Sequence, residues 1–108
     1  DTFIAHIGGD DFFVGLRNYE FKKVFDLTDK VQIEFKNSVE NLYSKKDKEK
    51  GLLIAKDRFN IERSFNLLSV SSAIIEINPN SNISNFDSTL NVLKKASKGS
   101  TKPISSIL

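Results

Sequence analysis

The fold is decided near the start of the chain by the stretch Phe3-Ile4-Ala5-His6-Ile7-Gly8-Gly9-Asp10-Asp11-Phe12-Phe13-Val14-Gly15-Leu16. The runs 3–7 and 12–16 are apolar and rich in residues that favour strands. Between them, Gly8 and Gly9 can supply the positive φ angles of a tight turn at no steric cost. The stretch therefore predicts a β-hairpin over residues 3–16.

A long amphipathic helix is predicted after the hairpin, from about residue 19 to residue 43. Apolar residues recur there at steps of three and four, which places them on one face of a helix. This face consists of Val24, Leu27, Val31, Phe35, Val39 and Leu42. We expect it to pack against the hairpin.

The middle of the chain is predicted to form a charged loop and an arm. Charges alternate in sign over Lys45–Lys50, a pattern typical of a solvated loop. The short apolar run that starts at Gly51 is a strand candidate, and a polar turn over Asp57–Arg63 follows it. We therefore expect residues 51–65 to form an arm inserted between the long helix and the next strand.

Two strands are expected in the last part of the chain. Residues 65–77 are almost continuously apolar, as in a strand buried inside a sheet. Residues 103–108 are a candidate closing edge strand. Because an uncovered sheet edge favours unwanted pairing, we expect further strands upstream of residue 1.

A second helix is expected between those strands, over about residues 84–98. Ser84 and Asp87 have the spacing of a capping box, and Gly99 is placed to end the helix. The residues expected to face inward are Phe86, Leu90 and Leu93. Because helices are interleaved with strands, residues 1–108 are predicted to form one two-layer α+β domain with an antiparallel-type sheet.

Composition narrows the classes of function. The chain contains no cysteine and one histidine, which excludes disulfides, thiolate metal sites and multi-histidine metal cages. Its 16 basic and 14 acidic residues are interspersed, so no field of one sign points to a nucleic-acid partner or to direct membrane contact. No apolar run approaches the ~20 residues needed to cross a bilayer. We expect a cytoplasmic domain, in a parent protein that could be anchored to a membrane elsewhere.

The hairpin resembles that of the GGDEF family, the diguanylate cyclase-like domains of bacterial cyclic-di-GMP signalling. Gly8-Gly9-Asp10-Asp11-Phe12 matches the signature turn of the family's GGDDF-type subset, in which an inserted arm also occurs. The run Leu68–Ala73 stands in place of the family's Thr-x-Ser-x-Gly strand. The resemblance implies a cyclase or polymerase-palm fold, which is ferredoxin-like. This chain would be its C-terminal part, lacking the first strand and two helices.

The resemblance assigns chemistry to the turn. Gly8 and Gly9 would lie against GTP, while Asp10 and Asp11 would be the catalytic and metal-binding carboxylates for Mg²⁺ or Mn²⁺. This agrees with elementary chemistry, because adjacent carboxylates can hold a hard cation against phosphate oxygens. The alternative from turn chemistry alone is a structural turn whose aspartates are merely solvated.

The resemblance also assigns nucleotide binding to the end of the last helix. Lys94, Lys95 and Lys98 lie near the place where the family has a lysine that neutralises phosphate. Their spacing does not match that pattern cleanly. Solvated lysines at a helix end, favoured by the helix dipole, are the alternative interpretation.

Three positions depart from the pattern of active family members. Asp11 stands where they usually have Glu, so its carboxylate is one methylene shorter, and such a displacement can cost about 10²-fold in a positioned site. His6 stands where many have Arg, and an ordinary structural role in the strand is expected for it. Thr2 occupies the last position of the family's product-inhibition motif, which argues against inhibitory binding there.

The resemblance leaves three functions open. The first is a nucleotidyltransferase that, in a homodimer of its full-length parent, condenses two GTP into cyclic-di-GMP. The second is a degenerate, non-catalytic GTP-binding or regulatory module attached to a fused phosphodiesterase-type domain. The third is a purely structural interaction domain. Because two domains of the family must face each other with one GTP each, a monomer of this chain is not expected to turn over.

Overall fold

Helices are interleaved with pairs of strands in the computed structural model, which describes residues 1–108. Their order is β1 (Thr2–Gly8), β2 (Asp11–Leu16), α1 (Phe21–Glu40), α2 (Lys45–Lys50), β3 (Leu52–Lys56), β4 (Glu62–Asn66), β5 (Ala73–Glu76), a 3-10 turn (Ile83–Asn85), α3 (Phe86–Ser97) and β6 (Ile104–Ile107). The predicted α+β class is confirmed. No helix is long and apolar enough to cross a membrane.

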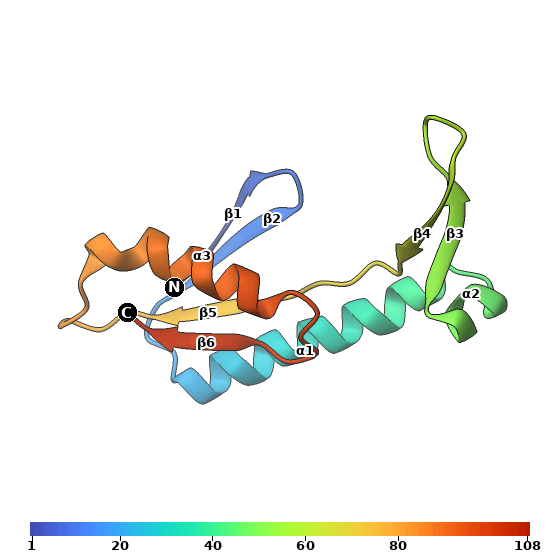
Figure 1. Cartoon of the computed structure of the whole chain (residues 1–108). Helices are drawn as coiled ribbons and strands as arrows, with labels where there is room; N and C mark the ends of the chain where they lie inside the picture. Colours follow the sequence, from blue (N-terminus) through green and yellow to red (C-terminus); the bar gives the residue numbers. More distant parts are fainter.

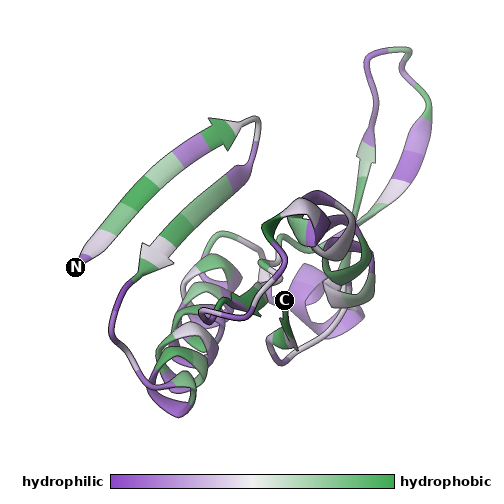
Figure 2. Cartoon of the chain, turned by 90° about the vertical axis from the view of Figure 1, so that its left-hand side faces the viewer, coloured by the Kyte–Doolittle hydropathy of each residue, from purple (hydrophilic) through white to green (hydrophobic).

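The β1–β2 hairpin forms as the sequence predicts. The two strands pair antiparallel, with Ile4 opposite Val14 and His6 opposite Phe12. The hairpin stands beside α3 (Figures 1 and 2), where the Phe13 ring meets the Phe86 ring at a centroid distance of 6.3 Å. This contact, together with an ion pair between Lys94 and Asp11, joins the hairpin to the last helix.

The strands form three separate pairs rather than one antiparallel sheet. β1 pairs with β2 and β3 with β4, both antiparallel, whereas β5 and β6 pair in parallel. A parallel pair needs a long crossover, and α3 supplies it. The helix lies along both strands (Figure 1), with Leu93 buried and Phe86 and Leu90 half-buried, as predicted.

The prediction of one strand over residues 65–77 is wrong. β4 ends at Asn66 and β5 begins only at Ala73, so residues 67–72 belong to no strand. An apolar run becomes a strand only where a neighbour offers a ladder of hydrogen bonds, and β6 matches only four residues. In the intervening segment the Leu68 amide instead donates to the Tyr43 hydroxyl, at 2.9 Å.

The predicted loop at Lys45–Lys50 is also wrong, because this segment is the short helix α2. The Ser44 hydroxyl accepts a 3.1 Å hydrogen bond from the Asp47 amide and so caps the first turn. Lys48 and Lys50 lie in the last turn, where the helix dipole favours cations, and Gly51 ends the helix. The capping residues outweigh the alternation of charge.

The last helix is confirmed, but its predicted cap is not. Residues 83–85 form a 3-10 turn, and α3 starts at Phe86. Asn82 caps this turn, since its side-chain oxygen accepts a 3.1 Å hydrogen bond from the Ser84 amide. Asp87 therefore does not act in a capping box with Ser84.

The predicted apolar face of α1 does not pack against the hairpin. Val39 is buried, but Leu27, Val31 and Leu42 are 45%, 58% and 75% exposed. The helix is held instead by polar contacts to the loop before β6. Those contacts are a 2.9 Å ion pair between Asp29 and Lys102 and a 3.4 Å hydrogen bond from Gln32 to the Thr101 carbonyl. A polar loop thus occupies a neighbouring face of α1 and leaves the apolar face open.

The core is small because the elements are spread out. Figure 1 shows β3 and β4 projecting from one end of α1, while α3, β5 and β6 lie toward the other end. The molecule measures 52 × 27 × 21 Å, and only five of 108 residues are buried. The ends of the two hairpins are therefore surface features.

Candidate functional site

The turn at Gly8–Phe12 closes the hairpin at its free end. Gly8 pairs with Asp11 across the turn, and a bulge falls between His6 and Gly8. Gly8 and Gly9 have φ angles of 138° and 56°, a backbone region that strains other residues. A Cβ atom on either glycine would meet no atom within 4 Å. The glycines are thus required by the backbone conformation, and the space beside them is open.

The two aspartates of the turn differ in their partners. Asp11 Oδ2 accepts a 2.9 Å hydrogen bond from Lys94 Nζ on α3. Asp10 is exposed and its carboxylate has no hydrogen-bond or ion-pair partner. Because the Lys94 and Asp11 side chains are 47% and 52% exposed, water screens their pair, which contributes at most about 1 kcal/mol. Asp11 can therefore be released to another cation at little cost.

His6 braces the turn from β1. Its Nε2 atom lies 2.7 Å from the Gly9 carbonyl oxygen, and since a carbonyl can only accept, Nε2 carries the proton. The imidazole also stacks on the Phe12 ring at a centroid distance of 4.8 Å. This is the structural role expected of a strand histidine. The specific bond to Gly9 was not predicted, although a histidine three residues before the turn's second glycine was the available signal.

Only one of the three candidate lysines reaches the turn. Lys94 does so through Asp11, whereas Lys95 and Lys98 are exposed and form no side-chain hydrogen bond or ion pair. Neighbouring residues on a helix point about 100° apart, so Lys95 faces away from the partner of Lys94. Lys98 is the C-cap residue and has left the helical conformation. The structure therefore brings Lys94 to Asp11 of the Gly8–Asp11 turn, and leaves Lys95 and Lys98 exposed.

The donor atoms at the turn fit Mg²⁺ only in part. Asp10 and Asp11 supply carboxylate oxygens, the ligand type that Mg²⁺ prefers. No group of three or more His, Cys, Asp or Glu side chains lies close enough together to hold a metal ion. Mg²⁺ usually takes one or two carboxylates together with waters and substrate phosphates. The turn therefore fits a metal that arrives with a nucleotide, and not one held by these side chains alone.

The turn is an exposed feature and not an enclosed pocket. A shallow depression of about 350 Å³ lies on the first turns of α1, and another of about 270 Å³ lies between α3 and β6. Gly8–Phe12 lines neither of them. Every residue from Gly8 to Phe12 is exposed. This turn alone would cover only a small part of a bound nucleotide. Other parts of the protein would have to cover the rest.

Comparison with known proteins adds no relative to this picture. No family model matches the sequence, and searches of curated proteins and of solved structures returned no match.

Proposed function

We propose that this chain is part of a GGDEF-type domain of bacterial cyclic-di-GMP signalling and binds GTP with Mg²⁺ at the Gly8–Phe12 turn. The observation that carries the proposal is the arrangement at the turn. Two glycines leave the backbone open, Asp10 has no partner, and Asp11 has one screened partner in Lys94. A carboxylate pair kept available on a fixed turn is what metal-nucleotide binding needs.

The fold supports the same proposal at a coarser level. The parallel β5–β6 pair with α3 as its crossover, beside an antiparallel hairpin, is compatible with a cyclase or polymerase-palm domain. In the proposed domain, β1, β2, β5 and β6 belong to one sheet, which a further strand completes and on which helices pack as a second layer. The exposed apolar side chains of β1, including Ile4 and Ile7 at 73% and 63%, are those that such a layer would cover.

In the proposed mechanism, Gly8 and Gly9 let the backbone approach the triphosphate without a side chain in the way. Asp10 and Asp11 would hold Mg²⁺, which when bound neutralises phosphate charge and favours ionisation of the attacking 3′-hydroxyl. His6 keeps the turn in shape through its bond to the Gly9 carbonyl. Lys94 moves from Asp11 toward a phosphate oxygen, so that its charge is kept at the site.

Turnover in this proposal requires two copies. Each copy would hold one GTP, and each 3′-oxygen would form a bond to the α-phosphorus of the other nucleotide while pyrophosphate leaves. The parent protein would act in the cytoplasm, with a homodimer or a fused phosphodiesterase-type domain as its partner.

A non-catalytic GTP-binding module is the second candidate, and one observation favours it. Asp11 is one methylene shorter than the usual Glu and is already paired with Lys94. A carboxylate pulled back by one methylene can still bind a metal-nucleotide, but it is less able to assist in activating a hydroxyl.

The test is to incubate the full-length protein with GTP and Mg²⁺, to measure cyclic-di-GMP, and to measure GTP binding by calorimetry. We expect Mg²⁺-dependent binding that Asp10→Ala weakens at least about tenfold, with Asp47→Ala as the matched control on α2. Product formation selects the cyclase, and binding without product selects the module. If GTP binds equally well without Mg²⁺, or equally well to the Asp10→Ala variant, the proposal is wrong.

A further inference from the structure

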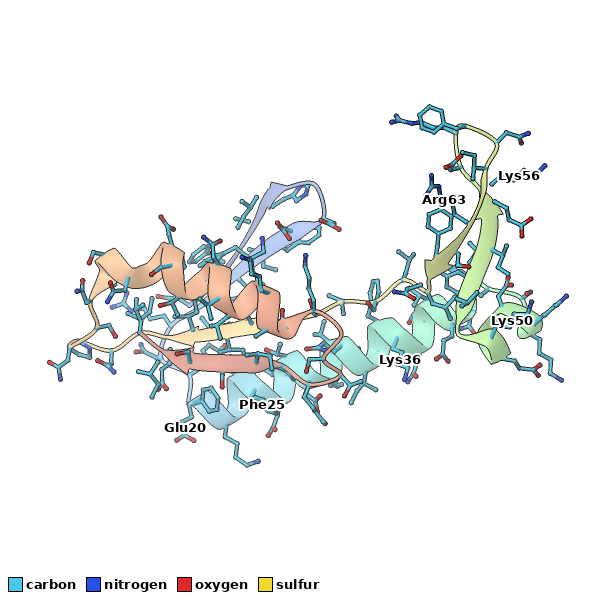
Figure 3. The ribbon with its side chains drawn as sticks, viewed as in Figure 1. Glu20, Phe25, Lys36, Lys50, Lys56 and Arg63 are labelled. Carbon is cyan, nitrogen blue, oxygen red and sulfur yellow. The ribbon has the colours of Figure 1, made fainter.

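Lys94 occupies the one carboxylate of the Gly8–Phe12 turn that has a partner. Its Nζ atom lies 2.9 Å from Asp11 Oδ2, and no other cationic side chain pairs with either aspartate of the turn. Cationic side chains of α2, β3 and β4 lie at the other end of α1 (Figure 3), and they include Lys50, Lys56 and Arg63. The only cation in contact with the turn therefore comes from α3.

An ammonium group at this carboxylate competes with a divalent metal ion. Mg²⁺ and Mn²⁺ bind carboxylate oxygens, and a lysine ammonium is a compact point charge that pairs with the same oxygens. A metal ion that reaches the turn without a nucleotide must either displace Lys94 from Asp11 or bind beside a like charge. Because the two side chains are 47% and 52% exposed, water screens this competition, and its effect on metal affinity is severalfold rather than orders of magnitude.

A nucleotide reverses the role of Lys94. Its triphosphate supplies oxygens that accept hydrogen bonds from an ammonium group, and lysine is a common phosphate binder. A metal ion that arrives with a nucleotide can therefore take the Asp11 carboxylate while Lys94 gains a phosphate as its new partner. The Asp10 carboxylate has no partner to lose. Lys94 thus opposes the free metal ion and favours the complex of metal and nucleotide.

The hairpin stays beside α3 when this ion pair breaks. The Phe13 and Phe86 rings meet at a centroid distance of 6.3 Å, and Lys94 lies about 12 Å farther along α3 than Phe86 at the rise of an α-helix. Both rings are half-buried, so their contact is an apolar one that does not depend on the charge of Lys94. Lys94 can therefore change partners while its helix remains next to the turn.

We propose that Lys94 selects the form in which a metal ion enters this turn. Paired with Asp11, it keeps a free divalent metal ion weakly bound, and by turning to a phosphate it admits the metal ion together with a nucleotide. The first part concerns only the turn and the metal ion. The second part rests on the proposed function, because it needs GTP at the turn. Lys94 is thus a specificity-determining residue, unlike the solvated lysines at the end of the same helix.

The signature of this role is a pair of effects with opposite signs. Lys94→Gln removes the charge and keeps a polar side chain, so free metal should bind more tightly and the metal-nucleotide complex more weakly. A lysine that only held the hairpin in place would move both affinities in the same direction. Lys94→Arg keeps the charge and should bind free metal as the wild type does. Lys95→Gln is the matched control, because it removes the same charge from the neighbouring position and touches no aspartate.

The test is a titration of the full-length protein with Mn²⁺ in the absence of nucleotide, followed by the broadening of the Asp10 and Asp11 amide signals in NMR spectra. We expect Lys94→Gln to bind Mn²⁺ at least about threefold more tightly than the wild type, as release from a screened ion pair allows. Lys95→Gln and Lys94→Arg should stay within about twofold of the wild type. With Mn²⁺ in excess, Lys94→Gln should bind GTP at least about threefold more weakly than the wild type.

Several results would overturn this inference. A Lys94→Gln protein that binds free Mn²⁺ no more tightly than the wild type would do so, including one whose Asp10 and Asp11 signals never broaden. A Lys95→Gln protein that gains as much Mn²⁺ affinity would show that only overall charge matters. A wild type that binds no GTP would refute the proposed function and the second part of this inference, whereas the comparison with free Mn²⁺ would still decide whether Lys94 competes for Asp11.

Discussion

The two hairpins of this chain close with turns that use their aspartates in opposite ways. In the arm, the Asp57 carboxylate is fully engaged by Arg63 and by two backbone amides. In the first hairpin, Gly8 and Gly9 provide the turn conformation, Asp10 has no partner and Asp11 has only Lys94. The first turn is therefore shaped by its backbone and the second by its side chain.

This difference separates a structural carboxylate from an available one. Asp57 cannot bind a cation without giving up the contacts that hold its own turn. Asp10 and Asp11 can do so without loss of the hairpin, because glycine conformation and the His6 bond to Gly9 keep its shape. The contrast is the physical ground for placing function at the first turn and a structural role at Asp57.

The largest difference between the two turns should follow removal of the carboxylates. Asp57→Ala removes the charged acceptor of the Phe59 and Ile61 amides, and an amide that loses its hydrogen-bond acceptor exchanges faster. We expect amide exchange at Ile61 to become roughly 10–100-fold faster. Asp10→Ala, the matched change, should leave exchange in β1 and β2 within about twofold. Equal acceleration in both hairpins would contradict the contrast.

Acid should disorder the arm through the same group. The Arg63 guanidinium, with the Ile61 and Phe59 amides, lowers the pKa of Asp57 from its ordinary value of 3.8. A lowered pKa means that the ionised carboxylate stabilises the fold above pH 3.8 and that this stabilisation is lost as the pH falls below it. The amide shifts of Phe59 and Ile61 should therefore titrate with a midpoint below 3.8, and a midpoint above that value would refute the assigned contacts.

Glycine at the first turn should matter more than its counterpart in the arm. Gly9 has a φ of 56° and Asn60 a φ of 61°. Gly9→Ala places a Cβ in the left-handed region and should destabilise the hairpin by about 1 kcal/mol. Asn60→Gly removes a Cβ from the left-handed region, and its effect on stability should be close to zero. Urea denaturation compares the two, and an Asn60→Gly effect as large as that of Gly9→Ala would go against this account.

The smallest effect is expected at the exposed ion pair. Lys94→Ala should lower the free energy of unfolding by less than about 1 kcal/mol, because both partners are about half exposed. Arg63→Ala should lower the free energy of unfolding more than Lys94→Ala does, because it breaks the pair with Asp57 that holds the turn of the arm. If Lys94→Ala proved the more damaging, Asp11 would be a structural residue rather than an available one.

The sequence predicted those parts of the fold that rest on local patterns. The first hairpin, α1, the arm and α3 follow from glycine placement and from the periodicity of apolar residues. Alternating charge at Lys45–Lys50 predicts a loop, whereas Ser44 and Gly51 carry the capping signal of the helix α2 that forms there. Capping, which is also a local signal, decides the structure of this segment.

Tertiary pairing accounts for the other errors. Leu67–Ser72 belongs to the same predicted strand as Ala73–Glu76, but only the latter has β6 alongside it. Likewise, no pattern in the sequence indicates that a polar loop at Thr101 and Lys102 would take hold of α1. At the candidate site, Gly8–Asp11 were found from their local motif. The choice of Lys94 over Lys95 and Lys98 needed the position of α3 beside the turn.

The most direct test of the central claim uses Mn²⁺ in place of Mg²⁺, because bound Mn²⁺ broadens nearby amide signals in NMR spectra. With GTP present, the account predicts broadening at Gly8, Gly9, Asp10 and Asp11 and none at residues 57–61 of the arm. Asp10→Ala should abolish that broadening. Equal broadening at both turns, or none at the first turn, would contradict the assignment of metal-nucleotide binding to the first turn.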